Sequence, residues 1–136
     1  MIEATAGGFE YGGRGFRFQS ASCKLDTGGF LYIEAVGRGC GLRLVGVPFP
    51  GTASFAELPG RTWEPDGDEL ARHADVFAEG GLTVRDKDLW IMRGRIACTR
   101  FDAERGLLTV SFRLSVQDGE YGREDEADGM AYCQIQ

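Results

Sequence analysis

The sequence predicts an all-β protein, a mostly antiparallel sandwich or flattened barrel of about eight strands with one short helix near residues 69–77. Two observations predict this class. Short apolar runs alternate with polar residues, and glycine supplies 21 of the 136 residues, roughly twice its usual share. Alternating runs separated by turn residues at regular spacing are typical of sandwiches and barrels. The length fits one domain, so we expect residues 1–136 to form a single β domain.

The clearest element is a hairpin over residues 94–117. Its second half alternates strictly, which predicts a strand with one buried and one solvated face. Residues 102–106 form a turn of suitable length, and Gly106 can adopt a positive φ. The apolar positions of this strand are Leu108, Val110, Phe112, Leu114 and Val116.

The same reasoning predicts strands elsewhere along the chain. A turn at residues 26–29 joins the strands predicted over residues 14–25 and 30–36 as a second hairpin. Residues 30–33 are apolar on both faces, which predicts a central strand. Apart from the strand that carries Leu108 to Val116, the predicted strands cover residues 14–25, 30–36, 42–47, 82–85, 89–92, 95–101 and 130–135.

The middle of the chain differs from the rest. Residues 48–67 contain all four prolines and predict a long irregular excursion. Ser54 and Glu57 have the spacing of a capping box. Asp68 can cap a helix over residues 69–77, whose buried face would carry Leu70, Ala74 and Phe77. We expect this loop and helix to cover an open end of the barrel.

Negative charge is concentrated near the C-terminus. Residues 118–128 hold six acids and one base, so they carry −5 of the formal net charge of −6. No stretch is rich in lysine or arginine, which argues against nucleic-acid binding, because that needs a cationic face. We expect an acidic loop between the last two strands that attracts a basic protein partner. Its predicted contact residues are Glu124, Asp125, Glu126 and Asp128.

The acids of this segment also resemble the start of a calcium loop. An EF-hand needs a glutamate at loop position 12, and counting from Glu124 that position is Ile135, so an EF-hand is excluded. An irregular calcium site stays open, but a solvated acidic loop is the simpler interpretation. We therefore predict no metal site and no cofactor.

Candidate nucleophiles are few. His73 is the only histidine, and a solvent-facing place on a short helix is the simplest interpretation of it. None of the four cysteines forms a CxxC pair, which argues against a zinc site. Cys40 lies between two glycines and is expected to be an exposed loop thiol, whereas the other three are expected to pack inertly. No catalytic residue is predicted, and an enzyme using His73 or a carboxylate pair is the least favoured class.

Two classes of function remain. The first is a non-enzymatic binding or protein-interaction module with the acidic loop as its contact. The alternative is a small-molecule-binding β-barrel with a pocket covered by residues 48–80, where Trp63 and His73 contact the ligand. We expect a cytoplasmic protein that does not bind membranes and that can form a homodimer through its sheet edges. The sequence shows neither a secretory signal nor an apolar run of the ~18 residues that a membrane helix needs.

Overall fold

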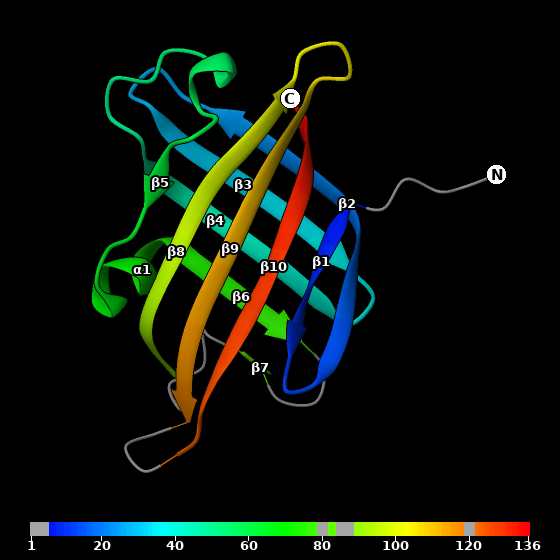
Figure 1. The fold of residues 1–136 in the computed structure, drawn as a ribbon, viewed down its shortest axis with the longest axis vertical. Coiled ribbons are helices and arrows are strands. Elements are labelled where there is room, and N and C mark those ends of the chain that lie inside the picture. Colours follow the sequence, from blue (N-terminus) through cyan, green and yellow to red (C-terminus); the bar gives the residue numbers. More distant parts are fainter. Residues whose placement is uncertain (1–5, 79–81, 84–88, 119–121) are drawn as a thin grey trace, which may run out of the picture.

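The computed structural model describes residues 6–78, 82–83, 89–118 and 122–136. They form one sheet, curled into a half-barrel, with a single short α-helix (Figure 1). The predicted all-β class is therefore confirmed. The strands are β1 (Gly7–Tyr11), β2 (Arg14–Leu25), β3 (Phe30–Gly37), β4 (Cys40–Pro48), β5 (Thr62–Trp63), β6 (Ala74–Ala78), β7 (Leu82–Thr83), β8 (Leu89–Asp102), β9 (Leu107–Asp118) and β10 (Glu124–Ile135).

The strand order in the sheet is β5-β8-β9-β10-β1-β2-β3-β4-β6-β7, and these neighbours pair antiparallel. The short β1 separates β10 from β2 along only part of their length. Beyond β1 the two long strands pair directly and in parallel, with Ile135 opposite Cys23. The sheet thus folds over on itself, and β8, β9 and β10 cross in front of β3, β4 and β6 (Figure 1).

Both predicted hairpins are present. β8 and β9 pair from Asp102–Leu107 down to Leu89–Asp118, and Gly106 has φ +63°. β2 and β3 pair around the turn at residues 26–29. The strands predicted separately at 89–92 and 95–101 are one continuous strand, because a bulge between Ile91 and Arg93 absorbs the break in the alternation.

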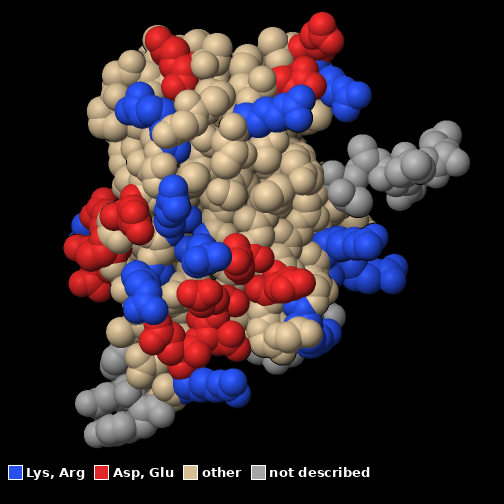
Figure 2. Space-filling model, viewed as in Figure 1, with Lys and Arg blue, Asp and Glu red and all other residues tan. Residues whose placement is uncertain are grey.

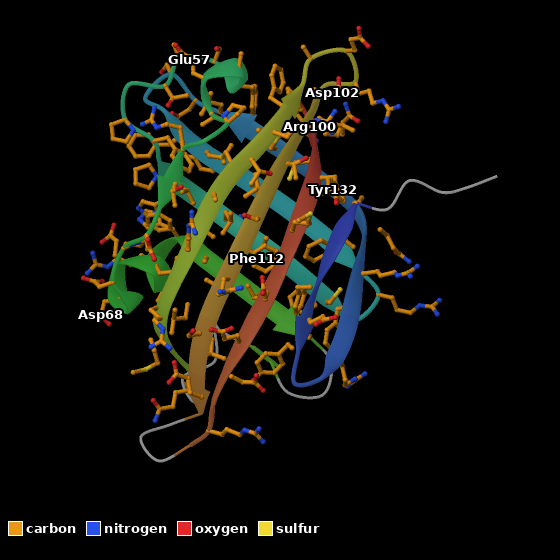
Figure 3. All side chains as sticks on the ribbon, in the orientation of Figure 1. Glu57, Asp68, Arg100, Asp102, Phe112 and Tyr132 are labelled. Atoms are coloured by element: carbon orange, nitrogen blue, oxygen red, sulfur yellow. The ribbon has the colours of Figure 1, made fainter. Side chains whose placement is uncertain are left out.

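The core fills the space between the two crossing layers. The five apolar positions predicted for β9 are all buried. Phe112 lies between the layers (Figure 3), and its ring centroid is 6.0 Å from that of Phe9 and 6.4 Å from that of Phe18. A cluster of rings from β1, β2 and β9 therefore joins the two layers at their centre.

The prediction of a helix over residues 69–77 was wrong at its C-terminal half. The helix α1 covers Gly67–His73, and the Asp66 side chain caps it by accepting a hydrogen bond from the Glu69 amide. Residues 74–78 form strand β6 instead. Inward residues Ala74, Val76 and Ala78 alternate there with Asp75 and Phe77, and pairing with β4 and β7 favours that period of two over the helical one.

The excursion before α1 fills the end of the half-barrel. Phe49 and Leu58 are buried in the core, and the 3₁₀-helix Phe55–Glu57 stands at the upper end of the molecule (Figure 1). The Glu57 carboxylate accepts hydrogen bonds from the amides of Ala53 and Ser54, as the predicted box requires. Phe49 and Leu58 therefore fill the interior at this end, and hydrogen bonds from within the segment hold its turn at residues 53–57.

The prediction that the strand over residues 30–36 is central is confirmed, since β3 lies between β2 and β4. Its outward residues Phe30, Tyr32 and Val36 are nevertheless 36–45% exposed. No helix or second sheet among the described residues packs on that outer face. Within the described residues, no helix is long and apolar enough to cross a membrane.

Candidate binding surfaces

The acidic segment near the C-terminus is largely a strand, which corrects the prediction of an acidic loop. β10 begins at Glu124, six residues before the predicted start, and pairs with β9 from Glu124–Gln117 onward. Alternation along the strand puts Glu124, Glu126 and Asp128 on its outer face, where all three are exposed. Asp125 points the other way, is half-buried, and accepts a hydrogen bond from the Glu126 amide.

Arginines from the neighbouring strands pair with the three outward acids. Arg93 Nη2 lies 3.0 Å from Glu124 Oε1. Arg113 Nη2 donates to Asp128 Oδ2 at 3.0 Å, and its Nε lies 3.9 Å from Glu126 Oε2. We call these five residues the β10 charge ladder.

The ladder crosses three strands. Arg113 of β9 is the register partner of Asp128 of β10 and of Arg95 of β8. Its hydrogen bond to Asp128, with the charges of Asp128 and Glu126, raises the pKa of Arg113 above its ordinary value. The two like charges of Arg95 and Arg113 therefore face each other across β8 and β9. Arg95 has no ion pair with any residue that the structure describes. Figure 2 shows the interleaved red and blue side chains on the lower part of this face.

Two shallow hollows border the ladder and meet at Arg95 and Arg113. One of about 270 Å³ lies against Glu64 and Pro65, and the other, of about 250 Å³, continues along the sheet to Thr99. A larger one of about 600 Å³ adjoins them at Ser111 and Asp128. Small residues line these hollows between the longer charged side chains: Gly7, Gly8, Gly94, Ala97, Ser111, Ser115 and Gly129.

The two predicted ligand-contact residues touch each other. The ring centroids of Trp63 and His73 are 5.3 Å apart, with the rings nearly perpendicular at 88°. Trp63 comes from β5, which pairs with β8, and His73 ends α1, next to β4. The contact therefore links the edge strand β5 to the end of α1 that lies beside β4. It was not foreseeable from the sequence, because the spacing of Trp63 and His73 does not determine how α1 lies against β5.

Both ring nitrogens of His73 face oxygen acceptors. Nδ1 lies 2.7 Å from the Val45 carbonyl oxygen, and Nε2 lies 3.2 Å from Glu69 Oε1. The side chain is 24% exposed, so the expectation of a solvent-facing histidine was wrong. Its engaged nitrogens fasten α1 to β4. A role for Trp63 and His73 in binding a ligand stays a prediction.

The cysteines are all buried free thiols. Cys40, expected to be exposed, starts β4 and is fully buried, because its strand pairs with both β3 and β6. Burial raises the pKa of Cys40, and it raises that of Cys98 to about 12, with a further contribution from Cys23. A hydrogen bond with Cys23 and burial raise the pKa of Cys133. Neutral thiols are poor nucleophiles, so burial favours packing over reactivity at these cysteines.

The described residues contain no group of three or more histidine, cysteine, aspartate or glutamate side chains placed to hold a metal ion. The alternation of β10 explains why its acids do not converge, since Asp125 is turned away from its neighbours. An irregular calcium site among these acids therefore has no support in this geometry.

A further hollow on the opposite, outer face of β2, β3 and β4 was missed from the sequence. It has a volume of about 370 Å³. Lys24 and Tyr32 are register partners across β2 and β3, as are Glu34 and Arg43 across β3 and β4. Only pairing register brings these residues together, and the sequence pattern carries no signal of it. The outward side chains around this hollow are Ser22, Lys24, Tyr32, Glu34, Arg43, Val45 and Gln136.

Comparisons with protein-family models, with curated proteins and with solved structures found no match for this chain. The function therefore has to be inferred from the residues and surfaces described above.

Proposed function

We propose that this chain is a non-enzymatic protein-interaction module that binds a basic partner through the outer face of β8, β9 and β10. The observation that carries the proposal is the exposed row of Glu124, Glu126 and Asp128 on one face of β10. Asp125, the fourth predicted contact, faces the other side of β10 and is left out of this surface.

The arginines of the ladder hold the carboxylates in fixed positions, although they also neutralise part of the negative charge. A contact that is already ordered loses less conformational entropy when a partner arrives. An ionised carboxylate has about four lone-pair sites, so one arginine leaves room for a cation of the partner. The hollows beside Arg95 and Arg113 give a partner's side chains a place to enter the face.

The charge of the surface also favours a basic partner. Acids outnumber arginines among the outward side chains that border these hollows or form the ion pairs. The four acids are Glu64, Glu124, Glu126 and Asp128, and the three arginines are Arg93, Arg95 and Arg113. Negative charge is in excess, and an excess of one sign speeds the encounter with an oppositely charged surface. The buried thiols and the engaged His73 nitrogens support a binding role over a catalytic one.

The test is affinity capture from source lysate with the immobilised protein as bait. The triple variant Glu124→Gln, Glu126→Gln, Asp128→Asn removes the acids of the row with little change in size. We expect it to lose the basic proteins that the unmodified bait retains. Recovery of the same proteins in the same amounts would overturn the proposal.

A matched control removes three other exposed acids, so that net charge is equal in both baits. Glu34→Gln, Asp68→Asn and Glu104→Gln lie on β3, on α1 and in the β8–β9 turn, away from the ladder. We expect this bait to retain the partner. Equal losses with both variants would mean that total charge, and not the β10 row, determines capture.

A further inference from the structure

The charged residues on the two outer faces of the sheet differ in how they are paired. On the front face, each outward acid of β10 has an arginine within 4 Å. On the rear face, Glu34 and Arg43 are direct register partners on β3 and β4, yet neither side chain makes an ion pair or hydrogen bond with any residue the structure describes. The same holds for Lys24, which lies opposite Tyr32 on β2.

These unpaired charges surround one hollow. Lys24, Glu34 and Arg43 border its 370 Å³ together with the exposed ring of Tyr32 and the side chain of Val45. That volume lies within the range of small-molecule sites. The hollow thus combines two cations, one carboxylate and an apolar wall, and the strands that carry them are held rigidly by pairing on both sides.

We propose that this hollow binds a free α-amino acid with an apolar or aromatic side chain. The argument is charge complementarity. The guanidinium of Arg43, with Lys24 beside it, is suited to the ligand's carboxylate, because arginine presents paired donors to planar anions. Glu34 takes the ligand's ammonium group, and the faces of Tyr32 and Val45 contact its side chain.

The site is independent of the proposed partner surface, because its residues come from β2, β3 and β4 and none belongs to the β10 charge ladder. The ligand's carboxylate is expected to lie between the two cations, Lys24 and Arg43, while its ammonium group meets Glu34. An amine would leave both cations without an anionic partner, and a simple anion would bring no cation for Glu34, so the ligand class is an amino acid.

The test is a titration of the ¹⁵N-labelled protein followed by amide chemical shifts. The probes are L-phenylalanine, L-tyrosine, L-leucine and L-methionine. We expect at least one to give saturable shifts at residues 22–24, 32–34 and 43–45. With that amino acid, Arg43→Gln and Glu34→Gln each weaken binding about ten-fold, the usual effect of losing one charge-assisted hydrogen bond. Glu104→Gln, an exposed residue of the β8–β9 turn that belongs to neither surface, leaves it unchanged.

Two analogues read each charge separately. 3-Phenylpropanoate lacks the ammonium group and phenethylamine lacks the carboxylate. If L-phenylalanine binds, both analogues should bind more weakly than it does. N-acetylation should weaken the binding of whichever of the four amino acids binds. Absence of saturable shifts with all four amino acids would overturn the proposal. Equal binding of the analogues, or unchanged binding by both rear-face variants, would overturn it as well.

Discussion

Leu70 of α1 occupies the space above Gly94 of β8. A Cβ atom built on Gly94 would lie 2.2 Å from Leu70 Cδ2 and 2.8 Å from Leu114 Cδ2. Leu70 is fully buried, so the helix reaches the sheet only because this position has no side chain. The single helix is therefore attached to the half-barrel at a glycine, and at its other end by His73.

Gly94→Ala is expected to destabilise the protein by about 1–3 kcal/mol, the usual cost of overpacking a core. The added methyl group would push Leu70 away and loosen α1 from β8. Chemical denaturation followed by circular dichroism measures the change. Gly15→Ala is the matched control, since a Cβ there meets no heavy atom within 4 Å, and it should leave the midpoint nearly unchanged. Equal midpoints for the two variants would contradict this packing.

His73→Ala is expected to lower the free energy of unfolding by about 1–2 kcal/mol. It removes the bond from His73 to the Val45 carbonyl and the ring contact with Trp63, each of which contributes on the order of 1 kcal/mol. The same denaturation experiment applies. Arg72→Ala removes only an exposed ion pair with Glu69 and should change stability by less than about 0.5 kcal/mol. If His73→Ala were equally mild, His73 would not fasten α1 to β4.

Stability is expected to fall at alkaline pH through the buried thiols. The pKa of Cys98 is about 12 in the folded protein, whereas an unperturbed cysteine titrates near about 8.5. Between these values the native state holds a proton that the unfolded chain has released, so stability decreases as pH rises. The slope reaches at most about 1.4 kcal/mol per pH unit for one thiol.

Urea denaturation at a series of pH values between about 8 and 10 measures this slope, because the thiol of the unfolded chain loses its proton in that range. Cys98→Ala removes one of the titrating groups and should make the decline shallower than in the unmodified protein. An identical slope in the variant would show that Cys98 does not titrate differently in the two states.

Arg113→Gln is expected to increase the recovery of the basic partner. The substitution leaves Asp128 and Glu126 without their arginine, so more negative charge faces the partner, and binding becomes more sensitive to salt. Capture at low and raised ionic strength measures both effects. Arg100→Gln removes an exposed charge from β8 without freeing a carboxylate and should have a smaller effect. A loss of partner on Arg113→Gln would contradict this prediction, and it would mean that the order Arg113 gives to Glu126 and Asp128 outweighs the charge that it neutralises.

Much of the fold could be predicted from the sequence where hydrophobic side chains mark the inward face. The strand over 107–118 and its turn at Gly106 are examples. β10 was only partly predicted, because its inward positions are the small residues Ala127, Gly129, Ala131 and Cys133, which give little hydropathy contrast. A run of acids followed by glycine is more typical of loops than of strands, and only pairing with β9 reveals the period of two.

The sequence pointed to individual candidate residues, but it did not show which of them lie next to one another in the folded protein. Trp63 and His73 were singled out as separate positions, and the contact between them depends on how α1 crosses from β8 to β4. The arginine partners of the β10 acids come from β8 and β9, 13–31 positions away in the chain, and register decides them. The rear hollow has no sequence signature, because its charges Lys24, Glu34 and Arg43 lie ten and nine positions apart on three different strands.

The most direct test of the proposed partner surface is site-specific photocrosslinking. A photoreactive amino acid is placed at Ser111, which borders the hollows beside the β10 charge ladder, or at Val36, which is exposed on the rear face. We predict that the bait with the label at Ser111 crosslinks to a basic protein in source lysate, and that the label at Val36 does not. Crosslinking from Val36 alone would contradict the proposal that the β8–β10 face is the partner surface.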